Sequence, residues 1–122
     1  MKFKDNRPIF KQIGDYILSN LVSRVWAEGD RLTSVRELAA EIEVNPNTVA
    51  RTYAMLSEMG IIYNQRGIGY FFTADAHKMA TELLQKEFIQ NELPELFRKM
   101  NLLDLDIDQI KHYYDVQKNE KK

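Results

Sequence analysis

The chain has 122 residues, of which 44% are hydrophobic and 29% charged, a size and composition typical of one compact unit or a small domain with an appendage. It contains no cysteine, which excludes disulfide bonds and thiolate metal sites, and no run approaches the roughly 18 apolar residues of a membrane span. The net charge is −1, with 9 Lys+Arg against 8 Asp+Glu in residues 1–74 and 8 against 10 in residues 75–122. The charge therefore gives no general attraction to nucleic acid, and DNA binding would depend on where the few cations lie.

The N-terminal part of the chain is predicted to be a helix with no leader before it. Met1–Asp5 is charged and no apolar run follows it, so we expect no signal peptide, no membrane partner and a cytoplasmic location. The helix is predicted to begin at Pro8, because proline suits a first turn, and to end at residues 28–30. Its buried stripe at helical spacing consists of Phe10, Ile13, Ile17, Leu21 and Val25.

A second, short helix is predicted to open at Ser34. Ser34–Glu37 has the pattern of a capping box, in which the serine hydroxyl and the Glu37 carboxylate each satisfy a backbone N–H. The turn Glu43-Val44 ends this helix. The side chains expected to point inward are Val35, Leu38, Ala39 and Ile42.

A third helix is predicted directly after that turn. Asn45 is a strong N-cap and Pro46 fits the first turn, while Gly60 stands where a left-handed C-terminal cap is wanted after Met59. The side chains expected to point inward are Val49, Tyr53 and Leu56.

The pattern then changes to that of strands. Ile61–Gln65 and Tyr70–Thr73 are rich in aromatic and β-branched residues, and the two glycines of residues 66–69 between them predict a hairpin turn. Residues 1–74 are thus predicted to form three helices and a two-stranded wing, which is a winged helix-turn-helix DNA-binding domain. The predicted fold class of the chain is mostly α (α+β).

Residues 75–122 are predicted to be a short C-terminal α-helical dimerisation region. Asp75 is the expected first N-cap, Pro94 should kink or split the helix, and a last helix should start at Asp106 and fray over residues 118–122. Helices of this total length cannot enclose much core alone, so their apolar stripe predicts pairing with a second copy of the chain. The expected interface residues are Leu83, Phe88, Leu96, Phe97, Ile110 and Tyr114.

The helix Pro46–Met59 is the candidate recognition helix, whose N-terminal part enters the major groove in helix-turn-helix proteins. Its inward side chains leave Asn47, Thr48 and Arg51 on the opposite side. Asparagine can pair with adenine, arginine with guanine, and threonine can touch phosphate or a thymine methyl group.

Two further arginines extend this candidate surface. Arg36 stands at a helix N-terminus, and Arg66 stands at the tip of the wing, in reach of a minor groove or a phosphate. The alternative is an ordinary solvated side chain, paired in the case of Arg36 with Glu37 or Glu41. The predicted DNA-binding residues are Ser34, Arg36, Asn45, Asn47, Thr48, Arg51, Arg66 and Gly67.

Other constellations match no known kind of site. Asp104–Asp108 looks like the start of an EF-hand loop, but Gln109 and Asp115 stand where that loop needs glycine and glutamate, so helix capping explains the aspartates better. His77 and His112 are far apart and belong to no metal-ligand cluster. No phosphate-binding glycine loop or nucleophile motif occurs. We therefore expect no metal, no cofactor and no enzymatic activity.

The run from Pro8 to Thr73 resembles the DNA-binding domain of GntR-family bacterial regulators. The family usually has proline where this chain has Thr33, and many members have arginine at the positions of Pro46 and Ala50, so base reading at those two positions is not carried over. The Asn-Pro-Asn-Thr-Val form and the short C-terminal region resemble the YtrA subfamily. The matching segments are Pro8 with Gln12-Ile13, Gly29–Leu32, Ser34–Ala39, Val44–Val49, Gly60-Ile61 and Arg66–Phe71.

This resemblance implies a function. Arg36, the start of the recognition helix, Arg66 and Gly67 correspond to DNA-contact positions of the family. YtrA-like members dimerise through two C-terminal helices and often regulate operons that encode ABC transporters. The resemblance thus implies a homodimer that binds a double-stranded, two-fold symmetric operator as a repressor, with recognition helices about 34–36 Å apart.

Two other classes of function stay open from the sequence. A winged-helix protein–protein module that has lost DNA binding is supported by the near-neutral charge, and it predicts no salt-dependent binding to any duplex. A ligand-gated sensor with a pocket between the C-terminal helices of a dimer predicts a ligand-dependent shift in melting temperature. The sequence names no effector for such a sensor.

Overall fold

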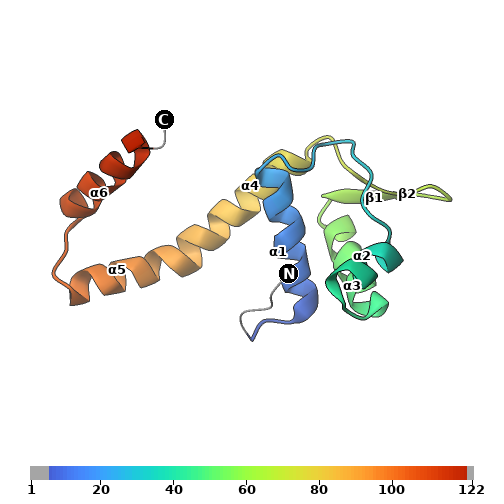
Figure 1. Cartoon of the computed structure of the whole chain (residues 1–122), viewed down its shortest axis with the longest axis horizontal. Helices are drawn as coiled ribbons and strands as arrows, with labels where there is room; N and C mark the ends of the chain where they lie inside the picture. Colours follow the sequence, from blue (N-terminus) through green and yellow to red (C-terminus); the bar gives the residue numbers. More distant parts are fainter. Residues whose placement is uncertain (1–5, 121–122) are drawn as a thin grey trace. The chain divides into compact units, whose positions relative to one another are not determined.

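The computed structural model describes residues 6–120 and contains six α-helices, one π-helical segment and one two-stranded sheet (Figure 1). The predictions for Met1–Asp5, and for residues 121 and 122 of the tail, lie outside the described residues. The chain divides into two compact units, with the division after Leu84. The first unit contains α1 (Ile9–Val22), α2 (Val35–Ile42), α3 (Pro46–Glu58), β1 (Ile62–Gln65), β2 (Gly69–Phe72) and most of α4 (Ala76–Glu87).

Helix α1 follows Pro8, as predicted, but ends earlier than predicted. Arg24 adopts a left-handed conformation with φ of 63°, and the N–H of Val25 donates to the carbonyl of Asn20 at 2.9 Å, which closes the helix. Ile13, Ile17 and Leu21 of the stripe are buried, Phe10 is half-buried, and Val25 is 66% exposed. The prediction that Val25 continues the stripe was therefore wrong, because the helix stops before reaching it.

Local capping forms both short helices. The N–H of Glu37 donates to the Ser34 hydroxyl at 3.2 Å, while the reciprocal bond from the Glu37 carboxylate is not formed within residues 6–120, so half of the predicted capping box is present. Glu43 closes α2 in a left-handed conformation, with φ of 57°. The Asn45 side chain then accepts from the N–H of Asn47 at 2.8 Å and starts α3.

Helix α3 is the centre of the first unit, because α1, α2 and β1 all contact it. Val49, Tyr53 and Leu56 are at most 1% exposed, as predicted, and Thr52 is buried beside them. Ala76 and Ala80 of α4 are also fully buried, so the first compact unit reaches past residue 74 to Leu84. The rest of this core comes from Ile13, Ile17, Leu18, Leu21, Leu32, Leu38, Ala39, Ile61, Ile62 and Phe72.

The wing forms as predicted, with β1 and β2 antiparallel and Gln65 opposite Gly69. A third segment, which the sequence indicated only as the end of the first helix, pairs with β2. The N–H of Leu32 donates to the Tyr70 carbonyl at 2.9 Å, and the N–H of Phe72 donates to the Asp30 carbonyl at 3.0 Å. The loop that leads into α2 is thereby attached to the root of the wing.

The second unit contains the end of α4, a π-helical segment η1 (Phe88–Glu92), α5 (Leu93–Leu102) and α6 (Ile107–Glu120). The N–H of Leu93 donates to the Phe88 carbonyl five residues back, so the turn before Pro94 is widened. A widened turn suits a residue that has no N–H to donate, and α5 begins there.

Helix α6 starts in a complete capping box. Asp106 accepts from the N–H of Gln109, and the Gln109 side chain accepts from the N–H of Asp106, both at 2.9 Å. The predicted capping role of Asp106 is therefore confirmed. Helix α6 continues to Glu120, so fraying from residue 118 was a wrong prediction for residues 118–120.

Candidate nucleic-acid interface

The candidate interface is built on the N-termini of α2 and α3. Each cap bond occupies one lone pair of the Ser34 hydroxyl or the Asn45 amide oxygen, and the serine hydroxyl proton and the asparagine amide N–H stay available as donors. Helix N-termini carry unpaired N–H groups and a positive partial charge, which favours anions. The two caps therefore build a positive edge and leave donors on it.

The predicted contact side chains on the first two turns of these helices reach solvent. Arg36, Asn47 and Arg51 are exposed, and Thr48 is half-buried. Asn47 and Arg51 are four residues apart on α3, which places them on the same side of the helix.

The pairing of the arginines distinguishes this surface from the rest of the first unit. Arg24 forms an ion pair with Glu28 at 2.6 Å, on the loop after α1. Arg36, Arg51 and Arg66, by contrast, form no ion pair with any carboxylate of residues 6–120. The expected alternative for Arg36, a pair with Glu37 or Glu41, is therefore not formed, and these guanidinium groups keep their donors available.

The tip of the wing is a tight turn. The N–H of Ile68 donates to the Gln65 carbonyl at 2.9 Å, and Gly67 has φ of 79°, a conformation that a residue with Cβ adopts at a cost. Arg66 precedes that glycine and is exposed. Gly67 thus has a turn-forming role whether or not its backbone also approaches a ligand.

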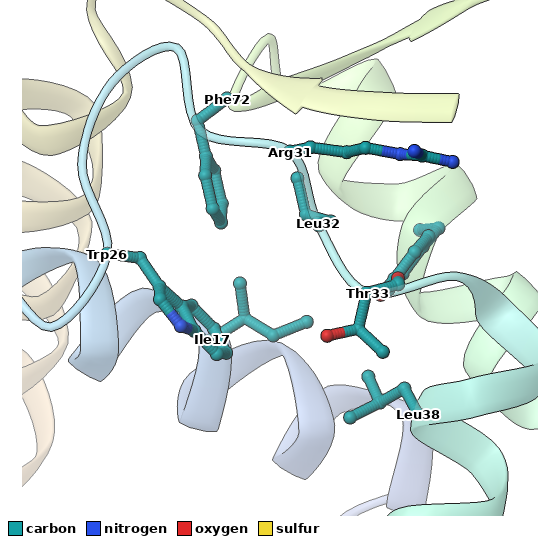
Figure 2. Close-up of a pocket in the computed structure, with 8 residues that line it drawn as sticks. Ile17, Trp26, Arg31, Leu32, Thr33, Leu38 and Phe72 are labelled. Atoms are coloured by element: carbon teal, nitrogen blue, oxygen red, sulfur yellow. The ribbon is translucent and has the colours of Figure 1, made fainter. Parts of the chain in front are cut away.

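Arg31 is a cation of this region that is not among the DNA-binding residues predicted from the sequence. Its backbone bridges to Phe71 of β2, and its guanidinium lies along Gly69, where an added Cβ would come within 3.0 Å of Nε. Figure 2 shows the side chain extending away from Trp26 and Phe72. Arg31 forms no ion pair within the described residues, and its place in the segment Gly29–Leu32 was the signal that could have identified it.

A buried tyrosine holds the entry to α2 against α3. The Tyr53 hydroxyl donates to the Thr33 carbonyl at 2.5 Å, next to the Ser34 cap, and its ring meets Tyr70 of the wing edge-on at 5.1 Å. Burial raises the pKa of Tyr53, so the hydroxyl stays protonated and remains a donor at neutral pH. This contact links α2, α3 and the wing.

A small cavity of the first unit lies near this contact, and it is too small for a ligand larger than water. Its volume is about 30 Å³, enough for a water molecule or two. Figure 2 shows Ile17, Trp26, Leu38 and Phe72 gathered around it. No cluster of three or more metal-ligating side chains, and no helix long and apolar enough to cross a bilayer, occurs in residues 6–120.

The predicted interface residues of the C-terminal part do not all have the same surroundings. Phe97 is 42% exposed and Tyr114 is 62% exposed, and Phe88 and Leu96 are exposed as well. Ile110 is half-buried. Leu83 differs, because it is half-buried against the core of the first unit.

Comparison with known proteins places this chain and its fold among bacterial regulators. The family model of bacterial regulatory proteins, gntR family, matches residues 10–72. The HTH-type transcriptional regulator YhcF of Bacillus subtilis is 41% identical over 85 residues, which cover 70% of this chain and 69% of that protein. The HTH-type transcriptional repressor YtrA of the same organism is 37% identical over 79 residues, or 65% of this chain and 61% of that protein.

A solved structure supports the same assignment over a longer stretch. The GntR family transcriptional regulator from Listeria monocytogenes superposes with a TM-score of 0.73 at 37% identity, and the match covers 93% of this chain and 97% of that one. The predicted winged helix-turn-helix and the predicted YtrA-like resemblance are both confirmed.

Proposed function

This chain belongs to the GntR family of bacterial regulatory proteins, and on that premise we propose that it is a homodimeric repressor that binds a two-fold symmetric DNA operator. The family is one of helix-turn-helix transcriptional regulators, which implies DNA binding and no catalysis. The first unit binds DNA and the C-terminal region joins two copies. The name of the similar YtrA protein supports the sign of regulation, since that relative is a repressor.

One observation carries the proposal. The unpaired arginines Arg36, Arg51 and Arg66 belong to α2, α3 and the wing, the three elements that contact DNA in winged helices. An unpaired guanidinium gains more from a phosphate or a guanine edge than one already neutralised by a carboxylate. In this proposal Asn47 and Thr48 read bases, while Ser34, Asn45 and the backbone at Gly67 donate to phosphates.

The dimer is supported by the exposed apolar side chains of η1, α5 and α6. Two copies would present two recognition helices about 34–36 Å apart, to successive major grooves. By the resemblance to YtrA-like regulators, the operator would lie before an operon for an ABC transporter. A genome-wide footprint of the bound protein identifies that operon, and a reporter whose expression rises when the regulator is deleted identifies it as a repressor.

The test of DNA binding removes one arginine. Arg36→Ala is expected to weaken binding to a duplex selected by the wild-type protein from a random-sequence pool by more than about 1 kcal/mol, measured by fluorescence anisotropy. Lys111→Ala removes the same charge from α6 and is expected to leave that affinity within about twofold. An unchanged affinity for Arg36→Ala would overturn the assignment of α2 to the interface.

Salt dependence separates this function from a protein–protein module. Binding that neutralises phosphates releases counterions, so the affinity should fall steeply as salt is raised. A wild-type protein that selects no duplex from the pool at low salt would contradict the proposed function as a whole.

A further inference from the structure

Phe10 and Arg51 form a contact between α1 and the recognition helix that the proposed function does not use. The Arg51 Cζ atom lies 3.9 Å from the centroid of the Phe10 ring, well inside the range of about 6 Å for a cation–π interaction. Phe10 is half-buried in the first turn of α1, and Arg51 is exposed in the second turn of α3. The guanidinium therefore rests on a surface provided by another helix.

The backbone next to this contact is held as well. The hydroxyl of Thr52, which is fully buried, donates to the Phe10 carbonyl at 2.7 Å. Thr52 is the neighbour of Arg51, so main-chain and ring positions of Phe10 are both fixed relative to that part of α3. Gly14, one turn further along α1, lets the helices approach closely, since an added Cβ would come within 2.8 Å of the Met55 methyl group.

The contact leaves the donors of Arg51 free. A phenyl ring covers a face of the planar guanidinium, whereas its N–H groups point out along the edge. No carboxylate of residues 6–120 pairs with them. Arg51 also follows Asn47 by four residues, on the side of α3 that holds the predicted base-reading residues.

We propose that Phe10 is a positioning residue for DNA binding: its ring holds the Arg51 guanidinium ready to donate to a DNA phosphate. A free arginine side chain has about 2 kcal/mol of rotamer entropy, and a side chain held in place before binding loses less of it. Helix α1 thus contributes to affinity without touching DNA. The inference rests on the proposed function, because it requires that α3 binds DNA.

A double-mutant cycle tests this. Arg51→Gln is expected to weaken binding about tenfold to the selected duplex and to a scrambled duplex of the same composition, and to lower the salt slope by about one. Phe10→Leu is expected to weaken binding about three- to tenfold in the wild-type background, and not to weaken it further in the Arg51→Gln background. Phe10→Trp, which keeps an aromatic face, should bind like the wild type.

Two controls separate positioning from folding. Tyr16→Leu removes another aromatic side chain of α1, which packs edge-on against Trp26, and it should leave the affinity unchanged. In protein without DNA, the NMR resonance of the Arg51 Nε–Hε group should shift in Phe10→Leu, because the ring current of the phenyl group is lost. The thermal melting curve of Phe10→Leu should stay cooperative, which shows that the variant is folded.

The outcomes are distinct. Equal losses from Phe10→Leu in both backgrounds would mean a structural role only and overturn the positioning role. An unchanged salt slope in Arg51→Gln, or a loss restricted to the selected duplex, would overturn the phosphate contact while leaving the proposed function intact. A wild-type protein that binds neither duplex would overturn both.

Discussion

The two compact units of this chain use apolar side chains in opposite ways. In the first unit a single core contains fifteen side chains, drawn from α1 to α3, the loop before α2, the wing with the residue before it, and α4. In the second unit Met100 is the one hydrophobic residue of the described part that is buried, and Phe97, Leu102 and Tyr114 are between 42% and 73% exposed. Helices whose apolar faces stay open gain little stability from their own packing, so the second unit offers an apolar surface on which a second copy would pack in the proposed dimer.

The polar faces of the second unit sharpen this difference. Arg98 pairs with Glu95 at 2.6 Å, and Lys111 pairs with Asp115 at 3.1 Å. Two ion pairs of this unit therefore lie within single helices, beside apolar faces that stay exposed. The first unit instead has a closed core, and its Arg36, Arg51 and Arg66 form no ion pair within residues 6–120.

The largest effect is expected from a charge on the open apolar face. Phe97→Glu should convert dimers to monomers, because a buried unpaired carboxylate is costly, and the loss of the second half-site should weaken operator binding about 10²- to 10⁴-fold. Light scattering measures the mass and anisotropy the affinity. Asn101→Glu places the same charge at an exposed polar position of α5 and should stay dimeric. A dimeric Phe97→Glu protein would show that this face is not the interface.

The same deletion in both units tests the contrast in packing. Leu56→Ala removes a fully buried side chain and should cost about 2–5 kcal/mol in urea unfolding. Leu102→Ala removes a side chain that is 73% exposed in a single chain, so in the monomeric Phe97→Glu background it should stay within about 0.5 kcal/mol. A comparable cost at Leu102 in the wild-type background would mean that a partner covers it in solution, and the comparison between the units would then hold for single chains only.

A smaller loss is expected from Tyr53→Phe. It removes the donor to the Thr33 carbonyl and should cost about 1–2 kcal/mol. Burial raises the pKa of Tyr53, so its contribution is present below the unfolded pKa of about 10 and is lost as the pH rises above it. Unfolding free energies measured from pH 8 to 11 should therefore fall less steeply in Tyr53→Phe than in the wild type; equal slopes would contradict this role.

The smallest effects are expected from substitutions at the helix caps. One should lower the stability of the whole first unit, and the other should affect a single helix. Ser34→Ala should lower global stability by about 1 kcal/mol, because α2 is part of the closed core. Asp106→Ala should instead speed amide exchange in α6 alone, since no core depends on that helix. Ser19→Ala in α1 serves as the control for the loss of an exposed hydroxyl. Global unfolding of Asp106→Ala in exchange experiments would show that the second unit is coupled to the first.

Much of the first unit could be predicted from short segments. Asn45 with Pro46, and Gly60 at the far end, mark α3 because caps depend on residues within one turn. The end of α1 was predicted too late in the chain, because the helix ends at a residue that gives no local signal. Arg24 adopts a left-handed conformation, which a glycine or asparagine at that position would have indicated. The sequence predicted that Pro94 kinks or splits the helix, but not the widened turn before it, because a proline alone does not determine how the preceding backbone adapts.

The candidate site divides in the same way. Asn47, Arg36 and Arg66 could be named from their positions in predicted elements. The role of the Phe10 ring could not, because Arg51, which it contacts, lies about 40 positions away in the chain.

By itself the sequence determined the order of helices, turn and wing, the caps of α2, α3 and α6, and the family to which the chain belongs. These features rest on local interactions and on the periodicity of apolar residues. Only the tertiary structure decided which arginines stay unpaired, which loop attaches to the wing and which apolar residues stay open. These three features depend on contacts between side chains that are far apart in the chain, and no short sequence segment determines such contacts.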